Sequence, residues 1–303
     1  MPKRAPTLKV RAYFESARWK NGVTCAHCGH NDCCKLQGRA HREGVYKCRN
    51  KECRKQFTVT VGTIFHRSHF TLKQWLLGFH MMAASKKSVS ALQLQRMLDI
   101  GSYKCAWHLA HRIRHVMAAS PLAEMLSGIV ECDETYIGGK PRKYDGKIRK
   151  RGRGTDKMPV VVLVERNGNA KSTPMKRLTG KNLKKEIIEN VHHTATIMTD
   201  ELPAYNGVGA HFAGGHKTVN HGSGEYARGD VNSNTAESYF ALLKRGIVGS
   251  FHHVSDKHLH RYCSEFDFRW NHRKVDDAAR FESALNRTQG VRLTYKEPTT
   301  LCA

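Results

Sequence analysis

The second half of the chain alternates short apolar, β-branched runs with segments of helical spacing. Apolar positions that alternate or run together indicate strands, whereas apolar positions three and four residues apart indicate one face of a helix. We therefore predict strands at 129–137, 159–166, about 171–178, 195–199 and 216–220, and helices at 180–191, 234–246 and 256–272. Strands that precede and separate helices are typical of an α/β domain with helices packed on one sheet.

The segment that precedes residue 120 has a helical pattern instead. Thr71 is placed to cap a helix, because it stands immediately before the first residue of a run with helical spacing. In this helix Trp75, Phe79 and Met82 share one face, which we expect to be buried.

Two further helices are predicted at 88–98 and 103–117, on either side of a short turn at 99–102. A helix, a tight turn and a basic second helix form the outline of a helix-turn-helix DNA-binding motif, in which the second helix reaches a groove. The basic side chains of this helix that could reach a major groove are Lys104, His108, His111, Arg112 and Arg114, and of these we predict DNA contacts for Lys104, His108 and Arg112. Trp107, Leu109, Ile113 and Val116 would face the core. The alternative is an ordinary helical linker, because the outline alone is a weak signal.

The net charge of the chain indicates which class of partner it binds. The 303 residues include 51 Lys plus Arg against 26 Asp plus Glu, which gives a formal net charge of +25. The basic residues are spread through the chain, so we expect double-stranded DNA rather than a membrane as the partner. No apolar run approaches the ~20 residues of a membrane span, and the N-terminus lacks the apolar core of a signal peptide. We therefore expect a cytoplasmic protein with reduced cysteines.

Six of the ten cysteines lie close together near the N-terminus. Cys25 and Cys28 form a Cys-x-x-Cys knuckle, and Cys48 and Cys53 form a second, looser pair. Four thiolates suit a closed tetrahedral Zn²⁺ site, in which metal binding supplies folding free energy to a segment too small for its own core. We therefore predict structural zinc at these four residues. The alternative ligands in the same segment are Cys33, Cys34, His27, His30 and His41.

Three acidic residues stand where a metal-dependent phosphodiester site requires them. Asp133 lies in the first predicted strand, Asp200 directly follows the fourth, and Glu237 stands near the start of a late helix. Such carboxylates can converge on a pair of Mg²⁺ ions, which activate the attacking oxygen and stabilise the leaving oxygen of a phosphodiester. An order of three strands, a helix, a further strand and late helices is that of the RNase H-like fold, which carries its acids on the same elements.

Two neighbours of Glu237 extend this prediction. Lys244 shares its helix face and would grip the phosphate next to the reacting bond. Asn234 is either a helix cap or a metal ligand. The other acids beside the site are expected to be structural, and they are Glu131, Glu134, Glu201 and Asp230.

A basic loop joins the first two predicted strands. Positions 139–157 hold nine basic residues against two acids, and the glycines among them argue against a packed element. Either the loop stays solvated and disordered, or it orders on DNA. We favour the second reading because the loop leaves the strand that carries Asp133. The basic residues expected to contact DNA in this half of the chain are Arg149, Lys150, Arg151 and Arg245.

These motifs together resemble a known family. They are VECDETYIGGK, TDELPAY, VNSNTAESYFALLKRGIVGSFHHVSDKHLHRYCSEFDFRWN, the ribbon ending in CRKQFTVTVGTIF, and SALQLQRML with KCAWHLAHRIR. The set resembles bacterial insertion-sequence DDE transposases, in the zinc-ribbon group numbered fifteen ninety-five and its ISXO-two-like branch. The resemblance runs from about residue 20 to about residue 280.

The resemblance implies an RNase H-like fold, Mg²⁺ or Mn²⁺ at the active site, and terminal inverted repeats as the DNA substrate. By the same resemblance the catalytic acids are Asp133, Asp200 and Glu237, with Lys244 as the accompanying basic residue. Some branches of the family are described with Asn in place of the third acid, which leaves the roles of Asn234 and Glu237 open.

The predicted function is that of a transposase, which cuts the ends of its element and joins the freed 3′-hydroxyls to target DNA. One site serves both steps, because each is a displacement at phosphorus. Two ends must be cut in concert, so we expect a homo-oligomer on DNA. The alternatives are a DNA-binding regulator whose RNase H-like domain has lost catalysis, and a structure-specific nuclease of the same fold.

The chain is predicted to contain four segments. They are a zinc ribbon at 1–62, a helix-turn-helix-like segment at 63–120, an RNase H-like catalytic domain at 121–285, and a C-terminal tail at 286–303.

Overall fold

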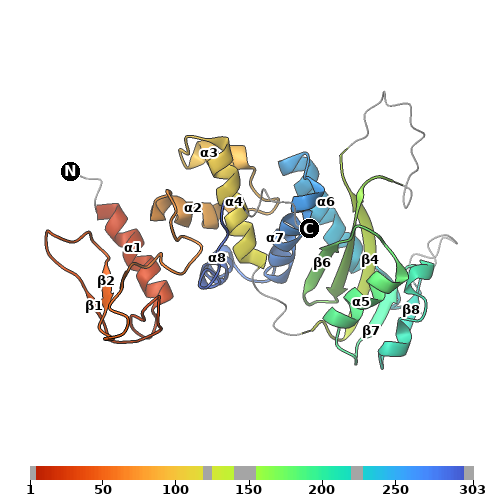
Figure 1. The fold of residues 1–303 in the computed structure, drawn as a ribbon. Helices are drawn as coiled ribbons and strands as arrows, with labels where there is room; N and C mark the ends of the chain where they lie inside the picture. The colour runs from red at the N-terminus through yellow and green to blue at the C-terminus, as the bar shows by residue number, and fades with distance from the viewer. Residues whose placement is uncertain (1–4, 119–124, 140–154, 220–227, 297–303) are drawn as a thin grey trace. The chain divides into compact units, whose positions relative to one another are not determined.

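The computed structural model describes residues 5–118, 125–139, 155–219 and 228–296. The chain divides into two compact units, each with its own core (Figure 1). Unit 1 comprises residues 1–85, 89–119 and 275–300, and unit 2 comprises residues 86–88, 120–274 and 301–303. Among the described helices, none is both long and apolar enough to span a lipid bilayer.

Unit 2 is built on a five-stranded mixed sheet. Its strands are β4 (Ile129–Ile137), β5 (Met158–Glu165), β6 (Ala170–Pro174), β7 (Thr196–Thr199) and β8 (His216–Thr218). Their order across the sheet is β6-β5-β4-β7-β8, in which β5 is antiparallel to both β4 and β6, while β7 and β8 run parallel to β4. This order and these directions are those of the RNase H-like fold, so the predicted fold class is confirmed.

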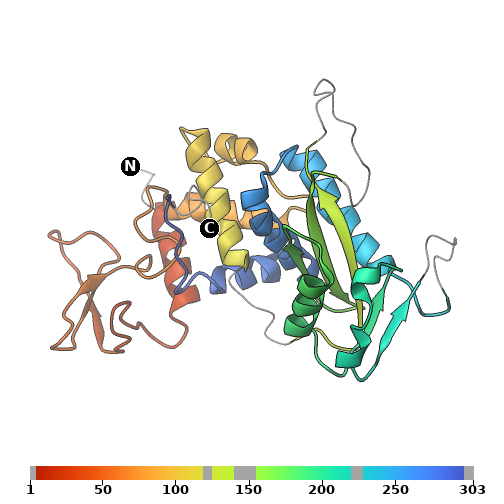
Figure 2. The ribbon, with the colours of Figure 1, turned by 45° about the vertical axis from the view of Figure 1, so that its right-hand side comes forward.

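Helices cover both faces of this sheet (Figure 2). The helix α5 (Gly180–Asn190) packs on one face, and α6 (Asn234–Gly246) and α7 (Asp256–Asn271) pack on the other. Successive side chains of a strand point to opposite faces, so β5 supplies both cores. Its Val161 joins the core under α5, and Val160 and Val162 join the core under α6 and α7.

Short irregular helices complete unit 2. Two 3₁₀ turns, Pro203–Tyr205 and Gly209–His211, follow β7, and a π-helical turn, Ile247–Phe251, directly continues α6. The strand β6 ends four residues before its predicted boundary, at Pro174, since proline cannot donate to the ladder.

Unit 1 combines a small three-stranded antiparallel sheet with helices. Its elements are α1 (Ala5–Arg18), β1 (Cys33–Lys35), β2 (Tyr46–Cys48), β3 (Gln56–Phe57), α2 (Leu72–Ala84), α3 (Ala91–Met97), α4 (Tyr103–Ala118) and α8 (Asp277–Asn286). The predicted cap of α2 is confirmed, because the Thr71 hydroxyl accepts the backbone N–H of Gln74 at 3.2 Å. Trp75, Phe79 and Met82 are fully buried, as predicted.

The sequence pattern did not predict α1 or α8. We placed residues 275–285 in the catalytic domain, whereas the structure groups them with unit 1. The reason is aromatic packing around Phe281 of α8. Its ring stacks on Tyr13 of α1 with centroids 6.2 Å apart, and it meets His80 of α2 at 6.0 Å.

Candidate functional site

The parallel pairing of β4 and β7 brings Asp133 and Asp200 together. The register pairs Glu131 with Met198. If this register is continued for two more residues, Asp133 lies beside Asp200. One carboxylate oxygen from each of Asp133, Glu134 and Asp200 lies within 4.8 Å of the other two. Asp133 and Glu134 in the middle of β4 and Asp200 directly after β7 therefore form one cluster, which we call the carboxylate cluster.

Glu134 is the member of the carboxylate cluster for which the sequence predicted only a structural role. Its Oε2 accepts a hydrogen bond from the Tyr205 hydroxyl at 3.2 Å. Tyr205 is fully buried, and burial, followed by the charge of Glu134, raises the pKa of its hydroxyl well above the ordinary value. The hydroxyl therefore stays protonated and acts as a fixed donor that orients the Glu134 carboxylate.

Backbone donors hold the other two carboxylates. Asp133 Oδ1 accepts the backbone N–H of Glu134 at 2.7 Å, and Asp200 Oδ1 accepts that of Leu202 at 3.1 Å. Three carboxylates this close repel one another unless a cation lies among them. Divalent ions that prefer oxygen ligands, such as Mg²⁺ and Mn²⁺, fit this set of donors.

Glu237 and Lys244 lie on the exposed side of α6, together with Ala241. This shared face agrees with the predicted helical spacing. Lys244 Nζ lies 5.8 Å from the centroid of the Phe240 ring. Glu237 is not among the three acids whose oxygens meet within 4.8 Å. The structure thus brings together two of the three predicted catalytic acids and leaves the third on the helix that packs against β4 and β5.

Asn234 does not cap α6. It is the first residue of the helix, Ser233 occupies the cap position, and the Ser233 side chain makes no capping hydrogen bond. The Asn234 side chain is exposed to solvent. The capping role that we predicted for Asn234 is therefore wrong.

A buried glutamate from β4 takes the place of the helix cap. Glu131 is fully buried, and its Oε2 accepts the backbone N–H groups of Thr235 at 2.8 Å and Ala236 at 3.0 Å. Its Oε1 accepts the Thr235 hydroxyl at 2.9 Å and Nε of Arg166 at 2.6 Å. These bonds satisfy N–H groups that a helix start otherwise leaves without partners. They also fix α6 to the strand that carries Asp133.

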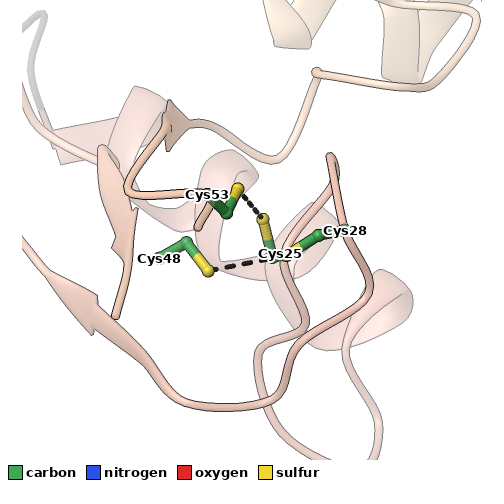
Figure 3. A group of neighbouring side chains, drawn as sticks. All are labelled: Cys25, Cys28, Cys48 and Cys53. Carbon is green, nitrogen blue, oxygen red and sulfur yellow. Dashed lines mark hydrogen bonds between the residues drawn. The ribbon is translucent and has the colours of Figure 1, made fainter. Parts of the chain in front are cut away.

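Four cysteines of unit 1 face one another (Figure 3). The Sγ atoms of Cys25 and Cys53 are 3.8 Å apart, and those of Cys28 and Cys48 are 3.7 Å apart. A tetrahedral site with Zn–S bonds of about 2.3 Å has S···S edges of about 3.8 Å. The geometry of these four thiols therefore fits the predicted structural zinc site.

The backbone of the knuckle supports thiolate at this site. Burial alone would raise the pKa of the Cys25 thiol, but hydrogen bonds from the backbone N–H groups of His27 and Cys28 and from the thiols of Cys28 and Cys48 together lower that pKa to about 7. The two alternative cysteine ligands donate elsewhere. Cys33 Sγ donates to the carbonyl oxygen of His30 at 3.4 Å, and Cys34 Sγ donates to that of Lys47 at 3.7 Å.

The predicted helix-turn-helix is present as α3 and α4, joined by residues 98–102. Leu109, Ile113 and Val116 of α4 are fully buried, as predicted. His111 and Arg114 are buried, so they do not fit a contact with DNA. Lys104 and His108 lie in the first two turns of α4, where Lys104 is exposed and His108 is half-buried with its Nε2 atom shielded from solvent. These first turns are the part of a recognition helix that contacts base edges.

Arg112 does not fit its predicted contact with DNA. Only 5% of it is exposed, its guanidinium lies 4.8 Å from the centroid of the Trp75 ring, and it donates to the His66 carbonyl oxygen at 3.4 Å. Burial lowers its pKa to about 10. Arg112 faces the helix α2 rather than solvent, because it falls on the apolar side of α4. Arg245 is exposed on α6, and the other predicted contacts, Arg149, Lys150 and Arg151, lie outside the described residues.

Sequence comparisons identify relatives of both parts of the chain. The family described as the ISXO2-like transposase domain matches residues 125–271, and the transposase zinc-ribbon domain matches residues 9–56. A protein of Halobacterium salinarum, described as an uncharacterized protein in transposable element ISH50, is 33% identical over 264 residues. The match covers 83% of this chain and 86% of that protein. The relative is archaeal, so the similarity extends beyond the bacterial elements named above.

Solved structures give a weaker likeness. A pre-cleavage Mos1 transpososome is 12% identical and covers 65% of this chain and 74% of that chain, with a TM-score of 0.23. A Mos1 transposase paired-end complex with the left transposon end is 13% identical and covers 64% of this chain and 76% of that chain, with a TM-score of 0.24. Likeness at this level is too slight to support a conclusion about this chain, so its family rests on the sequence matches.

Proposed function

This chain belongs to the ISXO2-like transposase family, whose members cut DNA and transfer strands, and we propose that it does so with divalent cations held by the carboxylate cluster. The observation that carries the proposal is the convergence of Asp133, Glu134 and Asp200 within 4.8 Å. Acids that meet where the middle of β4 lies beside the end of β7 form a site for hard cations in an otherwise strongly basic chain.

Divalent cations bound there, Mg²⁺ or Mn²⁺, would supply Lewis-acid activation of the attacking oxygen and offset charge on the leaving oxygen. Asp133 would hold them from the middle of β4, and Asp200 from the residue directly after β7. Glu134 would add a carboxylate from the side of Tyr205, and Glu237 would complete the set from α6. Lys244 lies on the same exposed side of α6 as Glu237, and it would bind the phosphate beside the reacting bond.

The remaining parts of the chain would bring DNA to this cluster. We propose that the four-cysteine site binds structural Zn²⁺ and that the first turns of α4, with Lys104 and His108, contact the terminal inverted repeats. The excess of basic residues would neutralise DNA phosphates. Because a transposable element has two ends, we propose that a homo-oligomer assembles on DNA, in the cytoplasm.

A nicking assay with a labelled terminal-repeat duplex tests this proposal. Wild-type protein should nick the duplex with Mg²⁺ or Mn²⁺ and not with EDTA. Asp133→Asn should abolish nicking while it leaves binding of the duplex unchanged, and Glu201→Gln, a matched change of a neighbouring exposed acid, should retain nicking. Binding without nicking by the wild type would favour a DNA-binding regulator. Nicking by Asp133→Asn at the wild-type rate would refute the assignment of the site.

A further inference from the structure

The segment 287–296 was predicted as part of a tail, but it lies against residues 62–71, the linker between the zinc ribbon and α2. Two backbone hydrogen bonds join them in unit 1. The N–H of Ile64 donates to the Thr288 carbonyl oxygen at 3.1 Å, and the N–H of Gly290 donates to the Gly62 carbonyl oxygen at 3.0 Å. The end of the described chain therefore returns to the part that precedes α2.

Beyond Gly290 the segment continues onto α4. Leu293 is buried, with 5% of its surface exposed. The ring of Tyr295 meets His108 of α4 edge to face, with centroids 5.2 Å apart. Arg292 is thus held between two fixed points, alongside the helix that carries the predicted DNA contacts Lys104 and His108.

Cationic groups from three stretches of unit 1 converge around Arg292. Burial lowers the pKa of His66, and the charges of Arg292 and Arg67 lower it further. Burial also lowers the pKa of Arg112, and Arg292 again adds to the effect. Geometry places these cations on neighbouring segments. Residues 62–64 are hydrogen-bonded to residues 288–290, and Arg112 of α4 donates to the carbonyl oxygen of His66, which directly precedes Arg67.

Among the described residues, no carboxylate forms an ion pair with Arg67 or Arg292. In the part of the chain that the structure describes, neither Arg67 nor Arg292 forms an ion pair or a side-chain hydrogen bond. Both side chains are exposed and able to reach a ligand. Arg112 is fixed over Trp75 and hydrogen-bonded to the His66 carbonyl oxygen, so it contributes positive potential without moving. The surface is therefore electrostatically incomplete without an anion.

We propose that Arg67 and Arg292 together bind a phosphate group of the DNA backbone beside α4. The inference rests on the proposed function, which makes duplex DNA the ligand of unit 1. A guanidinium group presents a planar fork of N–H donors that matches phosphate oxygens. Contacts to the backbone fix the position of a protein on the duplex, so this site would set the approach of α4 to the groove.

Fluorescence anisotropy of labelled duplexes over a range of salt concentrations tests the proposal. The variants are Arg292→Gln, Arg67→Gln and Lys185→Gln; Lys185 is an exposed lysine of unit 2 that serves as a charge-matched control. Each arginine variant should bind more weakly and lower the slope of log Kd against log salt by about 0.9, the value for one lost phosphate contact. The loss should be equal for a terminal-repeat duplex and an unrelated duplex, because phosphate carries no sequence information.

Arg292→Lys provides a second variant that keeps the charge and the packing of Leu293. It should keep the salt slope and lose part of the affinity, because lysine cannot bind bidentately. Wild-type affinity and slope in both glutamine variants, or a loss no larger than that of Lys185→Gln, would overturn the proposal. Metal-dependent nicking of pre-bound duplex by the arginine variants separates this outcome from failure of the proposed function, since the residues proposed to carry out nicking all lie in unit 2 and do not include Arg67 or Arg292.

Discussion

The Glu131 carboxylate accepts the backbone N–H of Thr235 at 2.8 Å, which joins the strand that carries Asp133 to the first turn of the helix that carries Glu237. A completely buried acid thus performs the capping that Ser233 and Asn234 do not perform. It also accepts Nε of Arg166, whose side chain is 20% exposed. The hydrogen bonds of Glu131 therefore set the distance between β4 and α6, the strand and the helix that carry Asp133 and Glu237.

Removal of the Glu131 carboxylate should destabilise unit 2. Glu131→Ala leaves Nε of Arg166 and the first N–H groups of α6 without their acceptor, which we expect to cost about 3–5 kcal/mol of unfolding free energy. Urea unfolding measures the loss. Glu189→Ala breaks an exposed pair with Lys185 and should cost about 0–1 kcal/mol. Equal stability of the two variants would show that Glu131 is not an anchor.

Tyr205→Phe should weaken metal binding while it preserves packing. The change removes the hydroxyl that donates to Glu134 at 3.2 Å and leaves the buried ring in place. Loss of a partner that orients a metal-binding carboxylate typically lowers metal affinity by about 10–100-fold. Calorimetric titration with Mn²⁺ measures this affinity without reference to activity. Glu134→Gln should reduce it at least as much, and Glu201→Gln should not. Unchanged Mn²⁺ affinity in both Tyr205→Phe and Glu134→Gln would exclude Glu134 from the site.

The zinc site offers a matched pair of cysteine variants. Cys48→Ser removes a thiol of the four-sulfur group and should abolish tight zinc binding and unfold the ribbon. Cys33→Ser changes the cysteine paired with it across β1 and β2, which lies outside that group, and should retain zinc. Elemental analysis of purified protein reports the metal content. Retention of zinc by Cys48→Ser, or loss of zinc from Cys33→Ser, would show that Cys33 rather than Cys48 is the zinc ligand.

Sequence reasoning located the features that depend on local pattern. The four zinc ligands follow from their spacing, and each predicted strand and helix around Asp133, Asp200 and Glu237 is present. Contacts between distant segments were not predictable in the same way. Glu134 neighbours Asp133 on a strand, where alternation assigns it to the opposite face, and its partner Tyr205 is distant in sequence.

The errors have different causes. Arg112 lies three residues after Leu109 and four before Val116, so helical spacing places it on the apolar face of α4, where it packs over Trp75. The prediction of a DNA contact followed its charge and not this spacing. Asparagine is a common helix-capping residue, but Glu131 of β4, and not Asn234, accepts the first N–H groups of α6. The return of residues 287–296 to unit 1 depends on backbone hydrogen bonds that carry no sequence signal.

Asp267 should make stability depend on pH. Its carboxylate is buried between α7 and β6, where it accepts the hydroxyls of Tyr239 at 2.5 Å and Ser172 at 2.8 Å. Burial raises its pKa to about 7, although these donors oppose the shift. Between the ordinary pKa of an Asp and pH 7 the native state therefore holds more protons than the unfolded state, so stability falls as pH rises.

The slope from this group is at most about 1.4 kcal/mol per pH unit in that window. Asp267→Asn cannot ionise and should lack this contribution, so its unfolding free energy relative to wild type should rise from pH 5 to pH 8. Urea unfolding at several pH values measures the difference. A difference that stays constant, or that changes in the opposite direction, would show that Asp267 is already ionised at low pH.

The central claim is that the carboxylate cluster performs DNA strand transfer. We would incubate a pre-cut terminal-repeat duplex with a free 3′-hydroxyl, supercoiled target DNA and Mg²⁺, and compare wild type with Asp200→Ala. The account predicts joined product from the wild type and none from the variant, although both bind the duplex equally. Joined product from Asp200→Ala at the wild-type level would contradict it.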